Sequence, residues 1–244
     1  MLQKKILGGM GVVLLLGTFI TVANANHSWG GYHWGRTANP FALQLGDNLS
    51  STWDPYLVTT STDWSTSTVL ETTIVPGTAL RHRSSQKDCS PATGRVEVCN
   101  KTYGNNGWLG VASIWISGSH ITKGAVKLND TYFSTVKYNT PAWKNLVMCQ
   151  EVGHTVGLDH QDEIFGNANL GTCMDYTSDP DGTLADPDQL GNEHPNMHDY
   201  GELDTIYAHF DSVTTAVQSV FSARAERDEN PGDWGKEVRK SKDG

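Results

Sequence analysis

The sequence predicts an α+β fold, because strand-like segments dominate its first half and helix-like segments its second. Five short segments carry the alternation or the β-branched content of strands, and all of them precede residue 130. One later segment is apolar on both faces of a helix, and another repeats apolar residues at helical spacing. Together these observations predict five strands, a buried helix and a closing helix.

The first 25 residues (1–25) have the composition of a secretory signal peptide. Two lysines precede a largely apolar run over 6–20, and Ala23 and Ala25 fit an A-x-A cleavage site. The run is too short to predict a membrane span, and polar and aromatic residues follow it. We therefore expect a single domain over 26–221 in a protein that is secreted and extracellular.

Charge and length limit the partners that the protein can have. The chain has 244 residues with 18 Lys and Arg against 27 Asp and Glu; loss of the two signal-peptide lysines leaves 16 against 27, a net charge of −11. Such an acidic protein is a poor match for nucleic acid or for an anionic membrane surface. The remaining length of about 219 residues is enough for one domain with its own core, and we expect a monomer.

The first half of the chain supplies the predicted strands. Residues 41–45 alternate apolar and polar side chains and predict a strand, and 53–68 has large apolar residues at roughly helical spacing and predicts a helix. Residues 69–75 are rich in β-branched side chains and stop at a Pro-Gly turn signal. The other three predicted strands are 95–103, 109–116 and 121–128.

The second half of the chain supplies the main helices. Pro141 predicts the start of a helix that Gly157 ends, and its apolar residues on both faces predict a buried central position. The chain then lacks periodicity through residue 195. Residues 198–210 predict a closing helix, and the charged segment 222–244, with few apolar anchors, is expected to be a disordered tail.

The most informative segment spans the end of the buried helix and reads QEVGHTVGLDH over 150–160. Gln150 and His154 are four residues apart, so their side chains project from one face of a helix, one turn apart. Gly157 allows a left-handed turn at the end of the helix. That turn would bring His160 back toward the same point, where a metal ion could be bound.

This segment resembles the zinc-binding motif H-E-x-x-H-x-x-G-x-x-H of the metzincin clan of zinc endopeptidases, most nearly its matrixin-like branch, with Gln150 in place of the first histidine. A downstream segment, GTCMDY over 171–176, resembles the Met-turn of the same clan. The resemblance covers residues 33–212. It implies a twisted, five-stranded mixed sheet backed by the motif helix, with a Met-turn, a C-terminal helix and a cleft between two lobes.

The resemblance assigns a role to each matching residue. The implied zinc ligands are Gln150, His154 and His160. Glu151 matches the general base, Met174 the residue packed beneath the metal, and Tyr176 a tyrosine that binds metal or stabilises the oxyanion in some relatives. Segment 109–116, which begins with Leu109 and ends with Ile116, resembles the edge strand that pairs with an extended peptide or protein substrate.

Because Gln150 replaces a histidine ligand, the sequence leaves open whether the protein is catalytically active. Its amide oxygen can coordinate zinc, but it is less basic than an imidazole nitrogen, and Tyr176, Asp159 or a water are further candidates to complete the site. We expect a zinc-dependent endopeptidase in which Glu151 is the general base toward metal-activated water. The alternative is a pseudoprotease, a secreted module that binds an extended chain without cutting it; in that case Gln150 is a buried polar residue satisfied by the backbone.

Four cysteines in an exported chain predict two disulfides, for which three pairings exist. Cys89 and Cys99 would close a short loop, which leaves Cys149 with Cys173. The second bond would tie the motif helix to the Met-turn and hold the ligands in register. Buried free thiols are the alternative.

Calcium is a second candidate metal. Six carboxylates follow Met174 closely: Asp175, Asp179, Asp181, Asp186, Asp188 and Glu193. Their spacing is not that of an EF-hand loop, which favours a solvated acidic loop containing His194 and followed by His198. The aromatic stretch 27–33 is a weaker candidate for metal. We expect the remaining, scattered histidines to be ordinary surface or core residues: His27, His33, His82, His120 and His209.

Overall fold

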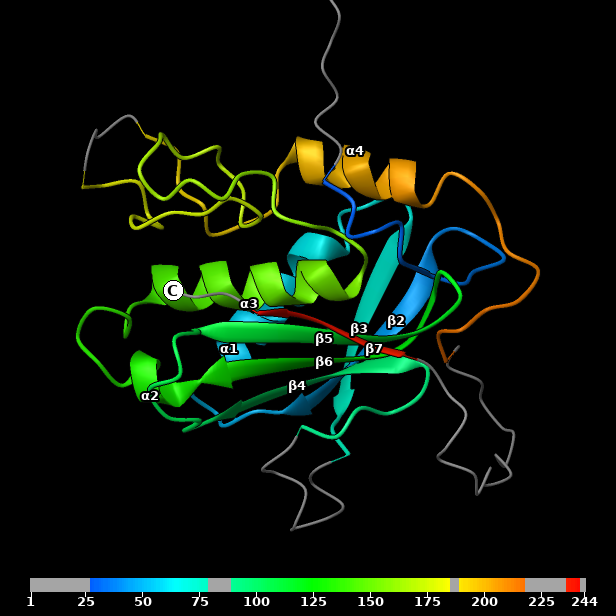
Figure 1. The fold of residues 1–244 in the computed structure, drawn as a ribbon, viewed down its shortest axis with the longest axis horizontal. Coiled ribbons are helices and arrows are strands. Elements are labelled where there is room, and N and C mark those ends of the chain that lie inside the picture. Colours follow the sequence, from blue (N-terminus) through cyan, green and yellow to red (C-terminus); the bar gives the residue numbers. More distant parts are fainter. Residues whose placement is uncertain (1–26, 79–88, 185–188, 218–235, 242–244) are drawn as a thin grey trace, which may run out of the picture.

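The structure, a computed structural model, describes residues 27–78, 89–184, 189–217 and 236–241. The predicted signal peptide 1–25 lies outside these residues. Within them the chain forms an α+β fold with one mixed sheet (Figure 1). Its elements are β1 His33–Trp34, β2 Phe41–Asn48, α1 Asp54–Trp64, β3 Leu70–Pro76, β4 Arg95–Lys101, β5 Gly110–Ser117, β6 His120–Asn129, α2 Asp130–Phe133, α3 Pro141–Thr155, α4 Met197–Ile206 and β7 Lys236–Ser241.

The sheet has seven strands where the sequence predicted five. Its order is β3-β2-β4-β6-β5-β7, and β1 pairs with the beginning of β6. Strands β2, β3, β4 and β6 run parallel to one another, whereas β5 is antiparallel to both β6 and β7. The five predicted strands are β2 to β6. Strand β1 escaped prediction because two residues are too few to show a period of two.

Strand β7 lies inside the segment that was predicted to be a disordered tail. In the part of 222–244 that the structure describes, Lys236–Ser241 pair with β5 over the register Val111↔Ser241 to Ile116↔Lys236. The composition of this strand is charged, so an apolar pattern could not predict it. Backbone N–H and C=O groups make the ladder, and any residue other than proline can supply both.

The irregular segment after Gly157 and α4 both lie on the side of α3 that faces away from the sheet (Figure 1). Helix α3 packs against α1 and against β5 and β6. Thr140 caps its first turn by accepting a hydrogen bond from the backbone N–H of Trp143, and Pro141 occupies the position where a missing N–H costs least. The helix is therefore fixed at the centre of the fold, as its apolar faces predicted.

Gly157 turns the chain at the end of α3, as predicted. Its φ is +102°, and a Cβ at this position would lie 2.2 Å from the carbonyl oxygen of Tyr32. Any other residue would therefore meet both an unfavourable backbone conformation and a steric clash. The turn sends the chain back past the C-terminal end of the helix, toward His154.

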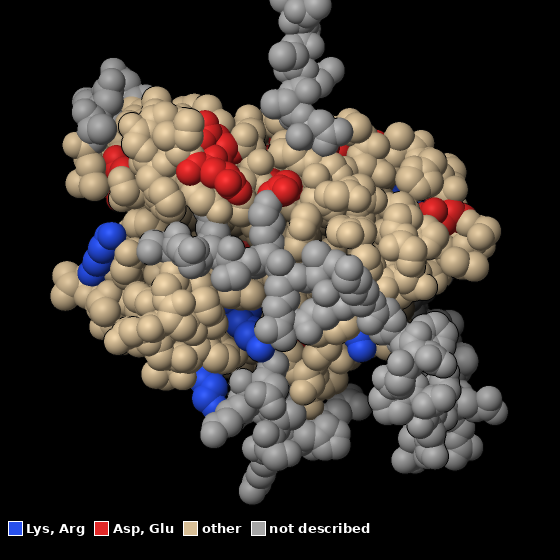
Figure 2. Space-filling view, in the orientation of Figure 1, with Lys and Arg blue, Asp and Glu red and all other residues tan. Residues whose placement is uncertain are grey.

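Charged side chains are unevenly distributed over the surface. Figure 2 shows the acidic side chains of one face in its upper part, over the irregular segment and near α4, and the Lys and Arg side chains mainly lower, over the sheet. No helix in the described part of the chain combines the length and the apolar composition that crossing a membrane requires.

Candidate active site

The two histidines of the motif converge on one point; we call His154 and His160 the cleft histidines. Their Nε2 atoms lie 2.8 Å apart, and both residues are buried. The Nδ1 atom of His154 lies 2.8 Å from the carbonyl oxygen of Leu158, and that of His160 lies 2.9 Å from a carboxylate oxygen of Glu163. Because these oxygens accept, each Nδ1 carries the hydrogen, and each neutral ring has its lone pair on Nε2.

With no hydrogen on either Nε2 atom, two lone pairs would repel at 2.8 Å; a proton on one ring, which makes the contact a hydrogen bond, or a metal ion between the rings removes that repulsion. A zinc ion takes neutral imidazole nitrogens as ligands. Metal-binding histidines usually donate their other N–H to a carbonyl or a carboxylate, as both cleft histidines do. The donor set of the cleft histidines therefore fits zinc.

Gln150 lies one helical turn before His154 and is also buried. Its amide nitrogen donates a hydrogen bond of 2.8 Å to the carbonyl oxygen of Cys173. Because a carbonyl only accepts, this contact identifies which end of the amide is nitrogen. The oxygen of Gln150 is then the atom that it can offer to a metal.

Asp159 and Tyr176, the other candidates to complete the site, lie in different places around His160. Asp159 accepts the backbone N–H of His160, and its oxygen is 3.5 Å from the Nδ1 atom of the ring. Asp159 therefore lies at the nitrogen that does not face His154, where its carboxylate, His160 and Glu163 form a separate group of close ligand atoms. The ring of Tyr176 packs edge-on against that of His160 at 4.4 Å between centroids.

Glu151 lies against the edge of the sheet. A Cβ at Gly110 of β5 would lie 2.7 Å from the Oε1 atom of Glu151 and 2.6 Å from a methyl group of Val147. The missing side chain at 110 is thus what lets the carboxylate approach the strand. The two elements and the irregular segment line a cavity of about 40 Å³, whose walls include Leu109, Gly110, Gln150, Glu151, Asp175 and Tyr176.

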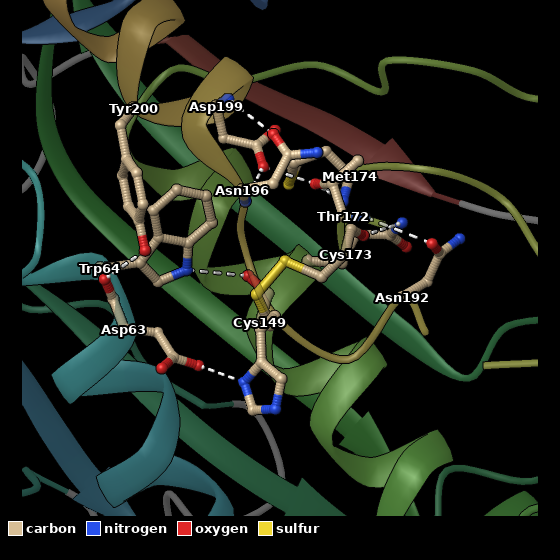
Figure 3. Close-up of a disulfide and its surroundings, with 12 residues drawn as sticks. Asp63, Trp64, Cys149, Thr172, Cys173, Met174, Asn192, Asn196, Asp199 and Tyr200 are labelled. Atoms are coloured by element: carbon tan, nitrogen blue, oxygen red, sulfur yellow. Dashed lines mark hydrogen bonds and ion pairs between the residues drawn. A yellow bond between two sulfur atoms is a disulfide. The ribbon is translucent and has the colours of Figure 1, made fainter. Parts of the chain in front are cut away.

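Both predicted disulfides are present, Cys89–Cys99 and Cys149–Cys173, and they account for all four cysteines of the chain. The second bond joins α3 to the irregular segment, at the residue before Gln150 and the residue before Met174 (Figure 3). It covalently links the first motif position to the segment that resembles a Met-turn.

Hydrogen bonds fix that segment from the side of α4 (Figure 3). Thr172 accepts the backbone N–H of Met174 and donates to Asp199, which also accepts the backbone N–H of Asn196. Met174 is fully buried, and a Cβ at Gly153 would lie 2.7 Å from its sulfur. Met174 therefore packs directly against α3 beneath the motif.

A buried pair of titratable groups, His27 and Asp199, supports the same region. The Nε2 atom of His27 lies 3.7 Å from the Oδ1 atom of Asp199, and its Nδ1 atom lies 2.8 Å from the carbonyl oxygen of Asp159. Burial lowers the pKa of His27 to about 4, although the charge of Asp199 opposes this effect. Burial raises the pKa of Asp199, against the hydrogen bonds from Thr172 and Asn196. Both shifts favour the neutral form of each group, because burial penalises charge.

The acidic stretch uses its described carboxylates as acceptors within loops. Asp179 accepts the backbone N–H groups of Thr183 and Leu184, and Asp175 accepts that of Leu170. Asp186 and Asp188 lie outside the described residues. Among the described residues, three groups of His, Asp and Glu place their ligand atoms close together: His27 with His198 and Asp199, His33 with His209 and Asp211, and Asp159 with His160 and Glu163. None of the three contains a carboxylate of the acidic stretch.

Two contributors to the site were not predicted, Glu163 and Gly110. Glu163 stands three residues after His160, a spacing that favours contact and was an available signal. Gly110 has no such signal, because its role depends on how β5 meets α3. Three of the histidines that were expected to be ordinary surface or core residues, His33, His120 and His209, lie together. His82 lies outside the described residues.

No protein-family model and no curated protein matches the chain. Among solved structures, the chain is similar at low identity to zinc-protease folds. One match is myroilysin, with 11% identity, a TM-score of 0.40, and coverage of 75% of this chain and 98% of that one. Another is high choriolytic enzyme 1, a hatching enzyme zinc-protease from the medaka fish Oryzias latipes, with 10% identity, a TM-score of 0.38, and coverage of 72% and 94%.

Proposed function

We propose that the chain is a zinc-dependent endopeptidase of metzincin type, secreted from the cell. One observation carries the proposal: the Nε2 atoms of His154 and His160 lie 2.8 Å apart, in the same motif as Gln150 and Glu151, which line a cavity. Two disulfides, which are typical of oxidising compartments, support secretion.

The residues of the cleft have separate tasks in this proposal. His154 and His160 would hold zinc, with the oxygen of Gln150 as a third donor. Zinc, when bound, supplies a Lewis acid that polarises the peptide carbonyl and makes water more acidic. Glu151 takes the proton of the attacking water and passes it to the departing amine. Tyr176 stabilises the negative charge that develops on the carbonyl oxygen.

An extended peptide or protein substrate would pair with β5, from Leu109 to Ile116. Strand addition gives affinity through backbone hydrogen bonds and selectivity through alternate side chains. The edge of β5 is already paired with β7 from Val111 to Ile116. Because one edge pairs with one strand at a time, substrate must displace Lys236–Ser241 in order to bind there.

The second candidate function is the pseudoprotease. It is favoured by the hydrogen bond between the amide of Gln150 and Cys173, which satisfies half of that side chain without a metal. It is also compatible with a β5 edge that binds strands, since strand addition does not require cutting.

A paired substitution separates the two functions. Glu151→Ala removes the base and no metal ligand, so it should lower kcat/KM for peptide hydrolysis by about 10²–10⁴-fold while zinc stays bound. Gln150→His restores a stronger ligand and should raise zinc affinity by about 10–100-fold or more, with hydrolysis kept or increased. Peptide hydrolysis and chelator competition are measured on both variants and on the wild type.

Each outcome has a definite meaning. Hydrolysis by the wild type that Glu151→Ala stops supports the endopeptidase. An inactive wild type that Gln150→His makes active supports a protease fold disabled at one ligand, and the pseudoprotease is then correct. If none of the proteins cuts peptides, the role assigned to Glu151 is wrong.

A further inference from the structure

Three histidines from different parts of the chain surround one carboxylate oxygen of Asp211, which lies outside the zinc-binding motif. His33 belongs to β1, His120 to β6, and His209 and Asp211 to the segment after α4. The Nε2 atoms of these histidines lie 3.7, 3.0 and 3.5 Å, in that order, from the Oδ1 atom of Asp211. The Nε2 atoms of His33 and His209 are 3.3 Å apart. We call His33, His209 and Asp211 the seam group.

The hydrogen positions of the seam group follow from its partners. The Nδ1 atom of His33 lies 3.0 Å from the carbonyl oxygen of Gly31, so it carries the hydrogen and leaves the lone pair on Nε2. Asp211 accepts the backbone N–H of Arg36 at 3.0 Å through Oδ2 and the N–H of His120 at 3.0 Å through Oδ1. The Nε2 atom of His33 therefore faces a carboxylate oxygen, and either a proton on that nitrogen or a metal ion between the two atoms makes the contact favourable.

The carboxylate of Asp211 is ionised at neutral pH. Burial acts to raise its pKa, but the hydrogen bonds from Arg36 and His120, and the positive charge of His120 and His33 when they are protonated, lower it below its usual value. An ionised carboxylate and a neutral imidazole are the forms in which these side chains bind a metal.

The spacing of the three atoms is that of a tetrahedral metal site. Zinc binds imidazole nitrogen and carboxylate oxygen at about 2.0–2.2 Å, which places the ligand atoms of a tetrahedron about 3.4 Å apart. The three separations in the seam group are 3.3, 3.5 and 3.7 Å. One ion at the centre of this triangle contacts all three atoms without a large movement of any side chain.

We propose that the seam group binds a second zinc ion, through the Nε2 atoms of His33 and His209 and the Oδ1 atom of Asp211. A hollow of about 410 Å³, lined by His33, His209 and Glu202 among others, adjoins the group and leaves room for a water as the fourth ligand. Gly31 and Arg36 orient the ligands, and His120 donates to the ligating oxygen, an arrangement typical of metal sites.

This second ion would fasten the two ends of the described domain together. The segment after α4 runs down beside the N-terminal segment (Figure 1), and backbone hydrogen bonds join Asp211 to Arg36 and Thr215 to Gly35. His33 and His120 are register partners in the pairing of β1 with β6. The ion therefore links β1 to the segment 207–217. We assign the ion a structural role, because it links two segments that are far apart in the sequence.

The test begins with a full-length protein in which the cleft histidines are removed by His154→Ala and His160→Ala. After chelation and dialysis against zinc, this variant should bind about one zinc ion per chain and gain thermal stability from it. Adding His209→Ala should abolish both. The matched control is His194→Ala, because His194 and His209 have similar exposure, 52% and 56%, and each lies near an aspartate.

Cobalt substitution gives an independent readout of the site. In the variant without the cleft histidines, bound cobalt should show the strong visible absorption of a tetrahedral ion, and His209→Ala should remove it. His33→Gln is a second ligand variant, and circular dichroism checks the folding of each protein. If zinc binds to the seam group but not to the cleft histidines of the wild type, the proposed function fails while the proposal of a second metal site is supported. Absence of zinc in the variant without cleft histidines, or zinc that His209→Ala leaves in place while the control behaves identically, overturns the proposal.

Discussion

The cleft histidines and the seam group use the same ligand chemistry in different surroundings. In both, a carbonyl or carboxylate holds the hydrogen of a ring on Nδ1, and the Nε2 lone pairs meet other ligand atoms at short distances. The cleft histidines, however, follow Glu151 in the motif and contact Tyr176 and Glu163 through His160, whereas the seam group lies between the two ends of the domain. If both groups bind zinc, as we propose, then it is the neighbours of each site and not its ligands that distinguish a catalytic role from a structural one.

The largest effect is expected from removing the disulfide beside the cleft. Cys149→Ala with Cys173→Ala should lower the free energy of unfolding by about 2–4 kcal/mol, because the unfolded chain loses a closed loop. The variant should also bind cleft zinc more weakly, since the bond links α3 to the segment before Met174. Urea denaturation and chelator competition measure the two effects.

The matched control is Cys89→Ala with Cys99→Ala. Its sequence separation is 10 residues against 24, so the loss of stability should be somewhat smaller. Zinc affinity at both sites should be unchanged. Equal loss of cleft zinc in the two double variants would show that the Cys149–Cys173 bond has no particular role in positioning the ligands.

The next effect concerns the wall of the cleft. Gly110→Ala should lower kcat/KM by about 100-fold, because its Cβ meets Glu151 and Val147 and displaces the base by a fraction of an ångström or more. Zinc content at the seam group should not change. Peptide hydrolysis and elemental analysis provide the measurements.

Gly201→Ala is the control for that substitution. Gly201 lies in α4 with nothing within 4 Å of its added Cβ, so the variant should keep full activity. A Gly110→Ala protein with wild-type kinetics would mean that Glu151 does not depend on the close approach of β5.

A smaller effect is expected from removing β7. A chain that ends at residue 235 lacks the strand that occupies the edge of β5, so KM for an extended peptide should fall several-fold while kcat changes little. A chain that ends at residue 241 keeps β7 and is the control. An unchanged KM in the shorter chain would show that substrate does not use this edge.

The smallest effect is a dependence of stability on pH. His27 has a folded pKa of about 4 against an ordinary value of 6.5, so the stability that it contributes is present above pH 6.5 and is lost as the pH falls toward 4. The raised pKa of Asp199 acts in the opposite direction, because protonation of that carboxylate favours the folded state as the pH falls. The net loss is therefore small.

His27→Asn tests this dependence in metal-free protein, where no ligand titrates against zinc. The free energy of unfolding, measured between pH 7 and 4, should decline less steeply in the variant than in the wild type. His194→Asn is the exposed control. A steeper decline in the His27→Asn variant than in the wild type would contradict the predicted sign.

The two histidine groups also show what sequence can reveal. The cleft histidines are six residues apart, and a helix followed by a glycine turn converts that spacing into convergence, so local rules were enough. The members of the seam group come from both ends of the domain and meet only because β1 pairs with β6 and the segment after α4 returns to Arg36. Contacts between segments so far apart in the sequence cannot be predicted from the spacing of residues within one helix or strand.

The same distinction holds for the elements. Strands β2 to β6 and helix α3 were predictable because their own residues show strand-like alternation or β-branched content, or apolar side chains on both faces of a helix. Strand β1 and helix α2, with two and four residues, are too short to show such a pattern. Strand β7 was unpredictable for a different reason, since its pairing depends on the free edge of β5 rather than on its own composition.

The measurement that tests the account most directly is an anomalous diffraction map of zinc-loaded crystals, recorded on both sides of the zinc absorption edge. The account predicts one peak between the Nε2 atoms of His154 and His160 and a second among His33, His209 and Asp211. A map with zinc elsewhere and no peak at His154 and His160 would contradict the central claim that these histidines form a metal site.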